Sequence, residues 1–118
     1  MSRTIRFHKF GPAEVLKCEE HAAALPAPGE VQVRVEAIGI SWYDVLWRQN
    51  LAPSPAHLPA GIGHEMAGIV TAVGAGVDDL AVGDKVASFP AESANAYPTY
   101  GELILMPRSA LTRYPDIL

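Results

Sequence analysis

The sequence is poor in cysteine, in positive charge and in long apolar runs, and each shortage excludes a class of protein. Cys18 stands alone, so the chain can form neither an internal disulfide nor an all-cysteine zinc site. Its 9 basic residues against 13 acidic ones give a net charge of −4, which argues against nucleic-acid or membrane-surface partners. No apolar run approaches the ~20 residues of a membrane-spanning helix.

The beginning of the chain also lacks the apolar core of a signal peptide, so we expect a cytoplasmic protein. Its 118 residues match the size of one domain, which we assign to residues 1–118. A hydrophobic fraction of 49% is enough for a modest core and excludes a disordered chain.

Glycine and proline, with 10 residues each, are spread along the chain and separate short apolar segments. This composition is typical of a small all-β domain, either a barrel or a sandwich. The clearest strand is residues 30–38, where four apolar residues alternate with polar ones and face one side: Val31, Val33, Val35 and Ala37. Further strands are predicted for residues 4–8, 15–19, 66–73, 85–89 and 100–106.

The period of the sequence changes to a helical one in residues 41–49. Ser41 suits an N-cap, and Asp44 stands three residues later, where the acid of a capping box belongs. Helical spacing would place four residues on one face: Trp42, Val45, Leu46 and Gln49. The proline-rich residues 51–63 predict a long ordered loop, a type of segment that is often functional, and residues 90–99 predict another loop.

Gly74 and Gly76 invite a nucleotide-binding interpretation, which the following residues exclude. The third glycine of a dinucleotide fingerprint would fall three residues after Gly76, where the chain has Asp79. The two glycines are therefore predicted to form a tight turn that needs positive φ. The chain has no recognisable cradle for a cofactor phosphate.

His64 and a cluster of aromatic residues each allow two interpretations. His64 follows the long loop and can act as a ligand or a titrating group, but taken alone it is more simply a hydrogen-bonded structural residue. The other histidines show no metal-ligand spacing. Three aromatic side chains of the helix can pack in the core or form a wall for a flat ligand: Trp42, Tyr43 and Trp47.

Several segments together resemble the medium-chain dehydrogenase/reductase superfamily, which includes the alcohol dehydrogenases. The N-terminal GroES-like domain of that superfamily is matched by residues 61–70, 73–77 and 83–86, and its zinc-free quinone oxidoreductase branch by residues 7–16 and 36–44. The resemblance extends from Thr4 to Pro107. It implies a mainly β fold: a GroES-like, partly open β-barrel with one or two short helices.

The resemblance implies that the chain is one domain of an oxidoreductase. Full-length relatives add a Rossmann domain that binds NADPH or NADH, and this domain is absent from residues 1–118. The whole enzyme is expected to transfer hydride to a quinone or an α,β-unsaturated carbonyl and to form oligomers. The isolated chain is expected to be inactive.

The resemblance also argues against zinc. In the zinc alcohol dehydrogenases, a cysteine that binds the catalytic zinc stands at the position of Ser41, and a histidine ligand stands at the position of His64. A neutral serine hydroxyl is a poor zinc ligand. The cysteines of a structural zinc lobe, expected near residues 90–100, are missing as well. A zinc-dependent alcohol dehydrogenase domain is therefore the alternative within the superfamily.

Roles for five residues follow from the same resemblance. Ser41 is expected to bind near the nicotinamide, and Trp42 and Tyr43 are expected to line the substrate pocket. His64 would be a polar or acid group in the same cleft. Asp44 would orient His64, as the matching aspartate supports the histidine ligand in the zinc enzymes, and its alternative role is that of a helix cap.

A reading from a different functional class is a stand-alone β-barrel that acts as an interaction module, like a co-chaperonin subunit. Such a module would need a flexible loop with an exposed apolar segment. Residues 51–60 are the candidate for that loop.

Overall fold

The computed structural model describes residues 1–89 and 94–115, and within them the chain is mainly β. One short α-helix and two single 3₁₀ turns interrupt the strands. The strands are β1 (Ser2–Phe7), β2 (Lys17–His21), β3 (Glu30–Gly39), β4 (Ala60–Gly61), β5 (Glu65–Val73), β6 (Lys85–Ser88), β7 (Leu103–Pro107) and β8 (Leu111–Arg113). The helices are α1 (Trp42–Arg48), η1 (Ala13–Val15) and η2 (Arg108–Ala110).

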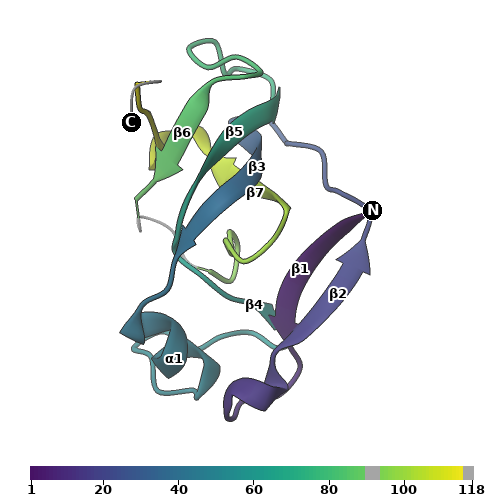
Figure 1. Cartoon of the computed structure of the whole chain (residues 1–118), viewed down its shortest axis with the longest axis vertical. Coiled ribbons are helices and arrows are strands. Elements are labelled where there is room, and N and C mark those ends of the chain that lie inside the picture. The colour runs from purple at the N-terminus through teal and green to yellow at the C-terminus, as the bar shows by residue number, and fades with distance from the viewer. Residues whose placement is uncertain (90–93, 116–118) are drawn as a thin grey trace.

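The strands form two antiparallel sheets, which in the described residues do not close into a barrel (Figure 1). The smaller sheet has the order β2-β1-β4, and the larger has the order β7-β3-β5-β6-β8. The mainly β, partly open fold predicted from the sequence is thus confirmed. No helix in these residues has the length and apolar character of a membrane span.

A short extended segment before β7, residues 100–102, joins the two sheets. On one side, the N–H of Ile5 in β1 donates to the carbonyl oxygen of Tyr100 at 2.9 Å. On the other, the N–H of Val35 in β3 donates to the carbonyl oxygen of Glu102, also at 2.9 Å. The strand predicted for residues 100–106 is therefore shorter in the structure. Strand β7 begins at Leu103, because the preceding residues also bond to β1 in the smaller sheet.

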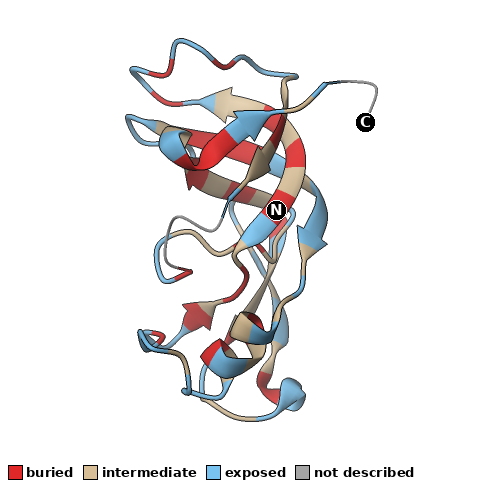
Figure 2. Ribbon diagram, turned by 90° about the vertical axis from the view of Figure 1, so that its left-hand side faces the viewer, coloured by how far each residue is buried: buried red, intermediate tan, exposed pale blue. Residues whose placement is uncertain are grey.

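Each sheet has its own apolar cluster (Figure 2). The cluster of the larger sheet contains buried residues from β3, β5, β6 and β7. The second cluster lies between the smaller sheet and α1, with Phe7 and Trp47 as its largest buried members. Tyr43 and Tyr100, which belong to the candidate site described below, pack against this second cluster.

Strand β3 departs from the predicted alternation at two residues, Gln32 and Ala37. Ala37 is exposed although it is predicted on the face of Val31 and Val33, because the pairing register with β5 shifts between Val35 and Ala37. Val31 and Val33 are fully buried as expected, but Gln32 on the other face is also buried. Its amide is satisfied there, since Nε2 donates to the carbonyl of Ala24 at 2.8 Å and Oε1 accepts from Thr71 Oγ1 at 2.7 Å. A loop that covers this face of the sheet, residues 22–29, explains why a polar side chain is buried there.

The predicted face of α1 is wrong. Trp42, expected beside Val45 and Leu46, leaves 77% of its surface exposed, whereas Asp44 and Trp47 are the buried residues of the helix. Strands β4 and β8, with two and three residues, lie in segments for which no strand is predicted. Their sequences are too short to show a period of two.

The predicted turn at Gly74 and Gly76 is confirmed, and the two positions require glycine for different physical reasons. Gly76 has φ +83°, in the left-handed region. A Cβ on Gly74 would overlap the carbonyl oxygen of Ala27, so a side chain is excluded by close backbone approach. Of the predicted loop 90–99, residues 90–93 lie outside the described residues, and residues 94–99 contain no strand.

Candidate active site

A buried carboxylate, Asp44, is the centre of the candidate site. It stands in the first turn of α1 and is only 3% exposed. Three donors from separate parts of the chain reach it. Oδ1 accepts from His64 Nδ1 at 2.9 Å, while Oδ2 accepts from the Tyr100 hydroxyl at 2.8 Å and from the Ser41 N–H at 3.2 Å.

The surroundings keep this carboxylate ionised. Burial raises the pKa of Asp44, but the hydrogen bonds from His64, Tyr100 and the backbone of Ser41 outweigh burial and hold the pKa below its usual range. Burial, together with the neighbouring Asp44 carboxylate, raises the pKa of Tyr100 well above its ordinary value, so its hydroxyl stays a donor. An ionised Asp44 accepts hydrogen bonds and cannot donate them, which places a proton on Nδ1 of His64.

Aromatic rings hold the imidazole of His64 from two sides. The Tyr43 ring lies edge-to-face with it at a centroid distance of 4.6 Å, and the Trp47 ring does so at 5.9 Å. Trp47 is fixed in turn by the hydrogen bond from its Nε1 to the carbonyl of Gly61, at 2.9 Å. The His64 side chain is 13% exposed, and its Nε2 has no hydrogen-bond partner among residues 1–89 and 94–115.

Gly63 allows this packing. Its φ of +105° lies in the left-handed region, and a Cβ there would overlap Thr99 Oγ1 and the ring of Tyr100. The backbone before His64 therefore passes directly against the segment that supplies Tyr100. Thr99 is fully buried, and its hydroxyl has no partner in the described residues.

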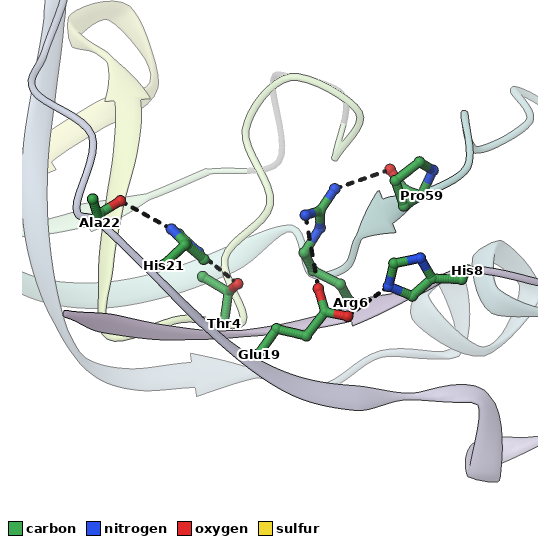
Figure 3. Close-up of polar contacts among 7 residues, drawn as sticks. All are labelled: Thr4, Arg6, His8, Glu19, His21, Ala22 and Pro59. Atoms are coloured by element: carbon green, nitrogen blue, oxygen red, sulfur yellow. Dashed lines mark hydrogen bonds and ion pairs between the residues drawn. The ribbon is translucent and has the colours of Figure 1, made fainter.

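Two of the remaining histidines lie elsewhere, beside β1 and β2 (Figure 3). His8 pairs with Glu19 at 2.5 Å, and His21 contacts Thr4 Oγ1 at 2.8 Å and the carbonyl of Ala22 at 3.0 Å. Within the described residues, no three His, Cys, Asp or Glu side chains gather as a metal site would require.

The family is identified by comparison with known proteins. Residues 27–116 match the alcohol dehydrogenase GroES-like domain. The chain belongs to this family. Within the medium-chain dehydrogenase/reductase superfamily, the relatives of this GroES-like domain include quinone oxidoreductases, as the resemblance predicted.

Two of these relatives are bacterial quinone oxidoreductases. The GroES-like domain is 49% identical over 86 residues to the quinone oxidoreductase of Salmonella typhimurium, and this alignment covers 73% of this chain and 26% of that protein. It is 42% identical over 104 residues to quinone oxidoreductase 1 of Escherichia coli, and this alignment covers 88% of this chain and 31% of that protein. The matched part of the chain thus spans between a quarter and a third of the length of these relatives.

Solved structures agree with this assignment. The Escherichia coli quinone oxidoreductase complexed with NADPH has a TM-score of 0.85 and 36% identity, with 100% of this chain and 34% of that chain covered. The human synaptic vesicle membrane protein VAT-1 homolog-like protein has a TM-score of 0.90 and 29% identity, with coverage of 100% and 37%.

The structure brings together some of the residues predicted for the site in the GroES-like domain. Asp44 contacts His64 as expected, and it accepts from the Ser41 N–H as a capping-box acid does, so both roles considered for it are present. Tyr43 contacts His64, whereas Trp42 points to solvent and Trp47 packs in the core. Of the two interpretations of the aromatic cluster, core packing is confirmed for Trp47.

Sequence reasoning missed Tyr100. It falls at the start of a predicted strand, 56 residues from Asp44, and carries no local pattern that marks it. Its neighbour Gly101 shows only that the chain passes closely against β1 there, since a Cβ on Gly101 would lie 2.8 Å from Thr4.

Proposed function

We propose that this GroES-like domain is the substrate-side domain of a zinc-independent, NADPH-dependent reductase that acts on a quinone or an α,β-unsaturated carbonyl. The observation that carries the proposal is the buried, ionised Asp44 bonded to Nδ1 of His64, whose Nε2 has no hydrogen-bond partner in the described part of the chain. The quinone oxidoreductase relatives and the NADPH complex of one of them supply the reaction class.

The chemistry divides between the cofactor and the chain. Bound nicotinamide would supply the hydride. Protonated His64 would donate the Nε2 proton to the oxygen that gains negative charge, and Asp44 would stabilise the imidazolium before this transfer. The proton and the hydride together complete the two-electron reduction of the acceptor, and His64 ends neutral with its Nδ1 proton still held by Asp44.

The exposed surface at the start of α1 suits a flat ring. Ile40 and Trp42 are each 77% exposed, and they flank Ser41 in the sequence. Large apolar side chains at such exposure stabilise a protein little, but they offer contact area to a planar ligand. We assign Ser41 to the cofactor side of this surface, and Trp42 and Tyr43 to the substrate side.

The phosphates of the cofactor would be bound elsewhere. The chain has no glycine-rich phosphate turn, since Gly74 and Gly76 serve a tight turn. A Rossmann domain in the same polypeptide would bind the phosphates and supply oligomer contacts. The isolated GroES-like domain would be inactive. NADPH is the proposed cofactor, NADH the alternative, and the cytoplasm the proposed compartment.

The loop that a co-chaperonin-like module would need to be flexible, residues 51–60, is held by hydrogen bonds to Asn95, which favours the enzyme proposal. The side chain of Asn95 accepts from the His57 N–H at 2.8 Å and donates to the Pro55 carbonyl at 3.2 Å. Ala56 between them is buried. Leu51 and Leu58 are exposed, but the segment that joins them is held.

The test measures oxidation of NADPH by 1,4-benzoquinone in the full-length protein, together with zinc content by elemental analysis. We expect turnover without stoichiometric zinc, and a loss of about 10²–10⁴-fold for His64→Ala, the range of general acid catalysis. His57→Ala, an exposed histidine in the loop, is the matched control and should keep wild-type turnover. Wild-type turnover in His64→Ala, or one zinc per chain that is lost with His64, would contradict the proposal.

A further inference from the structure

Tyr100 is the donor that connects the candidate site to the frame of the fold. Its backbone is fixed on two sides, since its N–H donates to the Ile62 carbonyl at 3.0 Å and its carbonyl accepts from the Ile5 N–H at 2.9 Å. Its hydroxyl reaches Asp44 Oδ2 at 2.8 Å. The carboxylate is thus held by a side chain from the segment that joins the two sheets.

The two carboxylate oxygens of Asp44 accept hydrogen bonds from different donors. Oδ1 accepts from His64 Nδ1, and Oδ2 accepts from the Tyr100 hydroxyl and from the Ser41 N–H. The Ser41 contact is the longer of the two at Oδ2, at 3.2 Å against 2.8 Å. Without the hydroxyl, Oδ2 would keep one weak donor, and the carboxylate could turn about its terminal torsion, which is broad for aspartate.

The orientation of Asp44 determines which nitrogen of His64 carries the proton. A neutral imidazole has one N–H, and the tautomer is set by the hydrogen bond that the other groups offer. While Oδ1 faces Nδ1, the neutral ring keeps its proton on Nδ1, so Nε2 is the nitrogen that takes up a second proton and can then donate it. If the carboxylate turns away, both tautomers become populated.

We propose that Tyr100 is a positioning residue, whose hydroxyl aims the Asp44 carboxylate at His64 and so keeps Nε2 available for proton transfer. The consequence for turnover rests on the proposed function. The consequence for the tautomer does not, because it concerns only residues of this chain. The two consequences can therefore be measured separately.

The variant is Tyr100→Phe, which removes only the hydroxyl. Tyr97→Phe is a matched control, because the Tyr97 hydroxyl also donates to a carboxylate, Glu30 Oε2, at the same 2.8 Å. Tyr97 packs against the core of the larger sheet and not against His64. Both variants lose one hydroxyl from one tyrosine, so a general loss of packing would affect them alike.

The first readout is the ¹⁵N spectrum of the His64 side chain in the 118-residue chain, at a pH where the ring is neutral. We expect the Nδ1–H tautomer in the wild-type chain and in Tyr97→Phe, and a mixture of both tautomers in Tyr100→Phe. A pure Nδ1–H tautomer in folded Tyr100→Phe would overturn the proposal. If that variant does not fold, 3-fluorotyrosine, which keeps a stronger donor hydroxyl, should retain the Nδ1–H tautomer, and its loss would equally overturn the proposal.

The second readout is NADPH-dependent reduction of 1,4-benzoquinone by the full-length protein. Loss of a hydrogen-bond partner behind a site residue typically costs about 10–100-fold in activity. We expect a decrease of this size in kcat for Tyr100→Phe, with the KM for NADPH unchanged. A mixed tautomer with wild-type kcat would overturn the positioning role, whereas a wild-type protein without turnover would count against the proposed function alone.

Discussion

Replacement of Asp44 by asparagine removes the charge that organises the site while keeping the size of the side chain. An asparagine has one acceptor oxygen and one NH₂ group, whereas the three neighbours of Asp44 all donate. At least one donor, the Nδ1–H of His64 or the Tyr100 hydroxyl, would then face another donor. We expect Asp44→Asn to destabilise the chain by about 1–3 kcal/mol, the range for leaving a buried donor without an acceptor.

The matched control is Asp79→Asn. Asp79 also accepts two short hydrogen bonds, from Arg108 at 2.7 and 2.9 Å, but its side chain is 65% exposed. An exposed ion pair contributes about 0–1 kcal/mol, because water and salt screen it. Urea unfolding followed by tryptophan fluorescence measures both variants, since Trp47 is buried beside the site.

The pH dependence provides a second check with a definite sign. The pKa of Asp44 in the folded chain lies below its unfolded value of about 3.9. The stabilisation by its charge is therefore complete above the unfolded pKa and is lost as the pH falls through the folded pKa. The difference in unfolding free energy between wild type and Asp44→Asn should narrow in acid. An equal effect of Asp44→Asn and Asp79→Asn at pH 7, or a difference that stays constant into acid, would refute the reasoning.

Two further substitutions test the close packing and the exposed surface of the site. Gly63→Ala should destabilise the chain by about 3 kcal/mol in urea unfolding, because its Cβ would overlap Thr99 at a positive φ. The control Gly29→Ala, where φ is +80° and the Cβ would meet open space, should cost only about 1–2 kcal/mol. Equal losses of unfolding free energy in the two variants would contradict the close approach at Gly63. Trp42→Ala should leave the unfolding free energy within about 0.5 kcal/mol of wild type, yet raise the KM for 1,4-benzoquinone about tenfold, or about 1.4 kcal/mol. An unchanged KM, as expected for the exposed control Leu25→Ala, would remove Trp42 from the substrate surface.

Local patterns predicted much of the fold because their physical causes are local. The alternation in residues 30–38 and the Ser41–Asp44 spacing each act within a few residues, and β3 and α1 form where these patterns stand. The Asp44–His64 contact was predicted through family resemblance rather than from local pattern. It is present because α1 and the loop before β5 meet above Trp47.

Other features depend on long-range contacts. Gln32 alternates as an exposed residue should, but it is buried because Ala24 and Thr71 approach it from other elements. Trp42 has the spacing of a core residue, yet α1 turns Trp47 inward instead. A hydrophobic period identifies a face of a helix but does not specify which neighbours are present to cover it.

The fold class, six of the strands, α1, the turn at Gly74 and the pairing of Asp44 with His64 could therefore be predicted from the sequence and its family resemblance. Only the tertiary structure decided that Tyr100 completes the site. The hydroxyl reaches Asp44 across 56 residues, because residues 100–102 bond to both sheets and Gly63 leaves room for the ring. Such a contact has no local signal, since it follows from where two sheets meet rather than from the residues next to Tyr100.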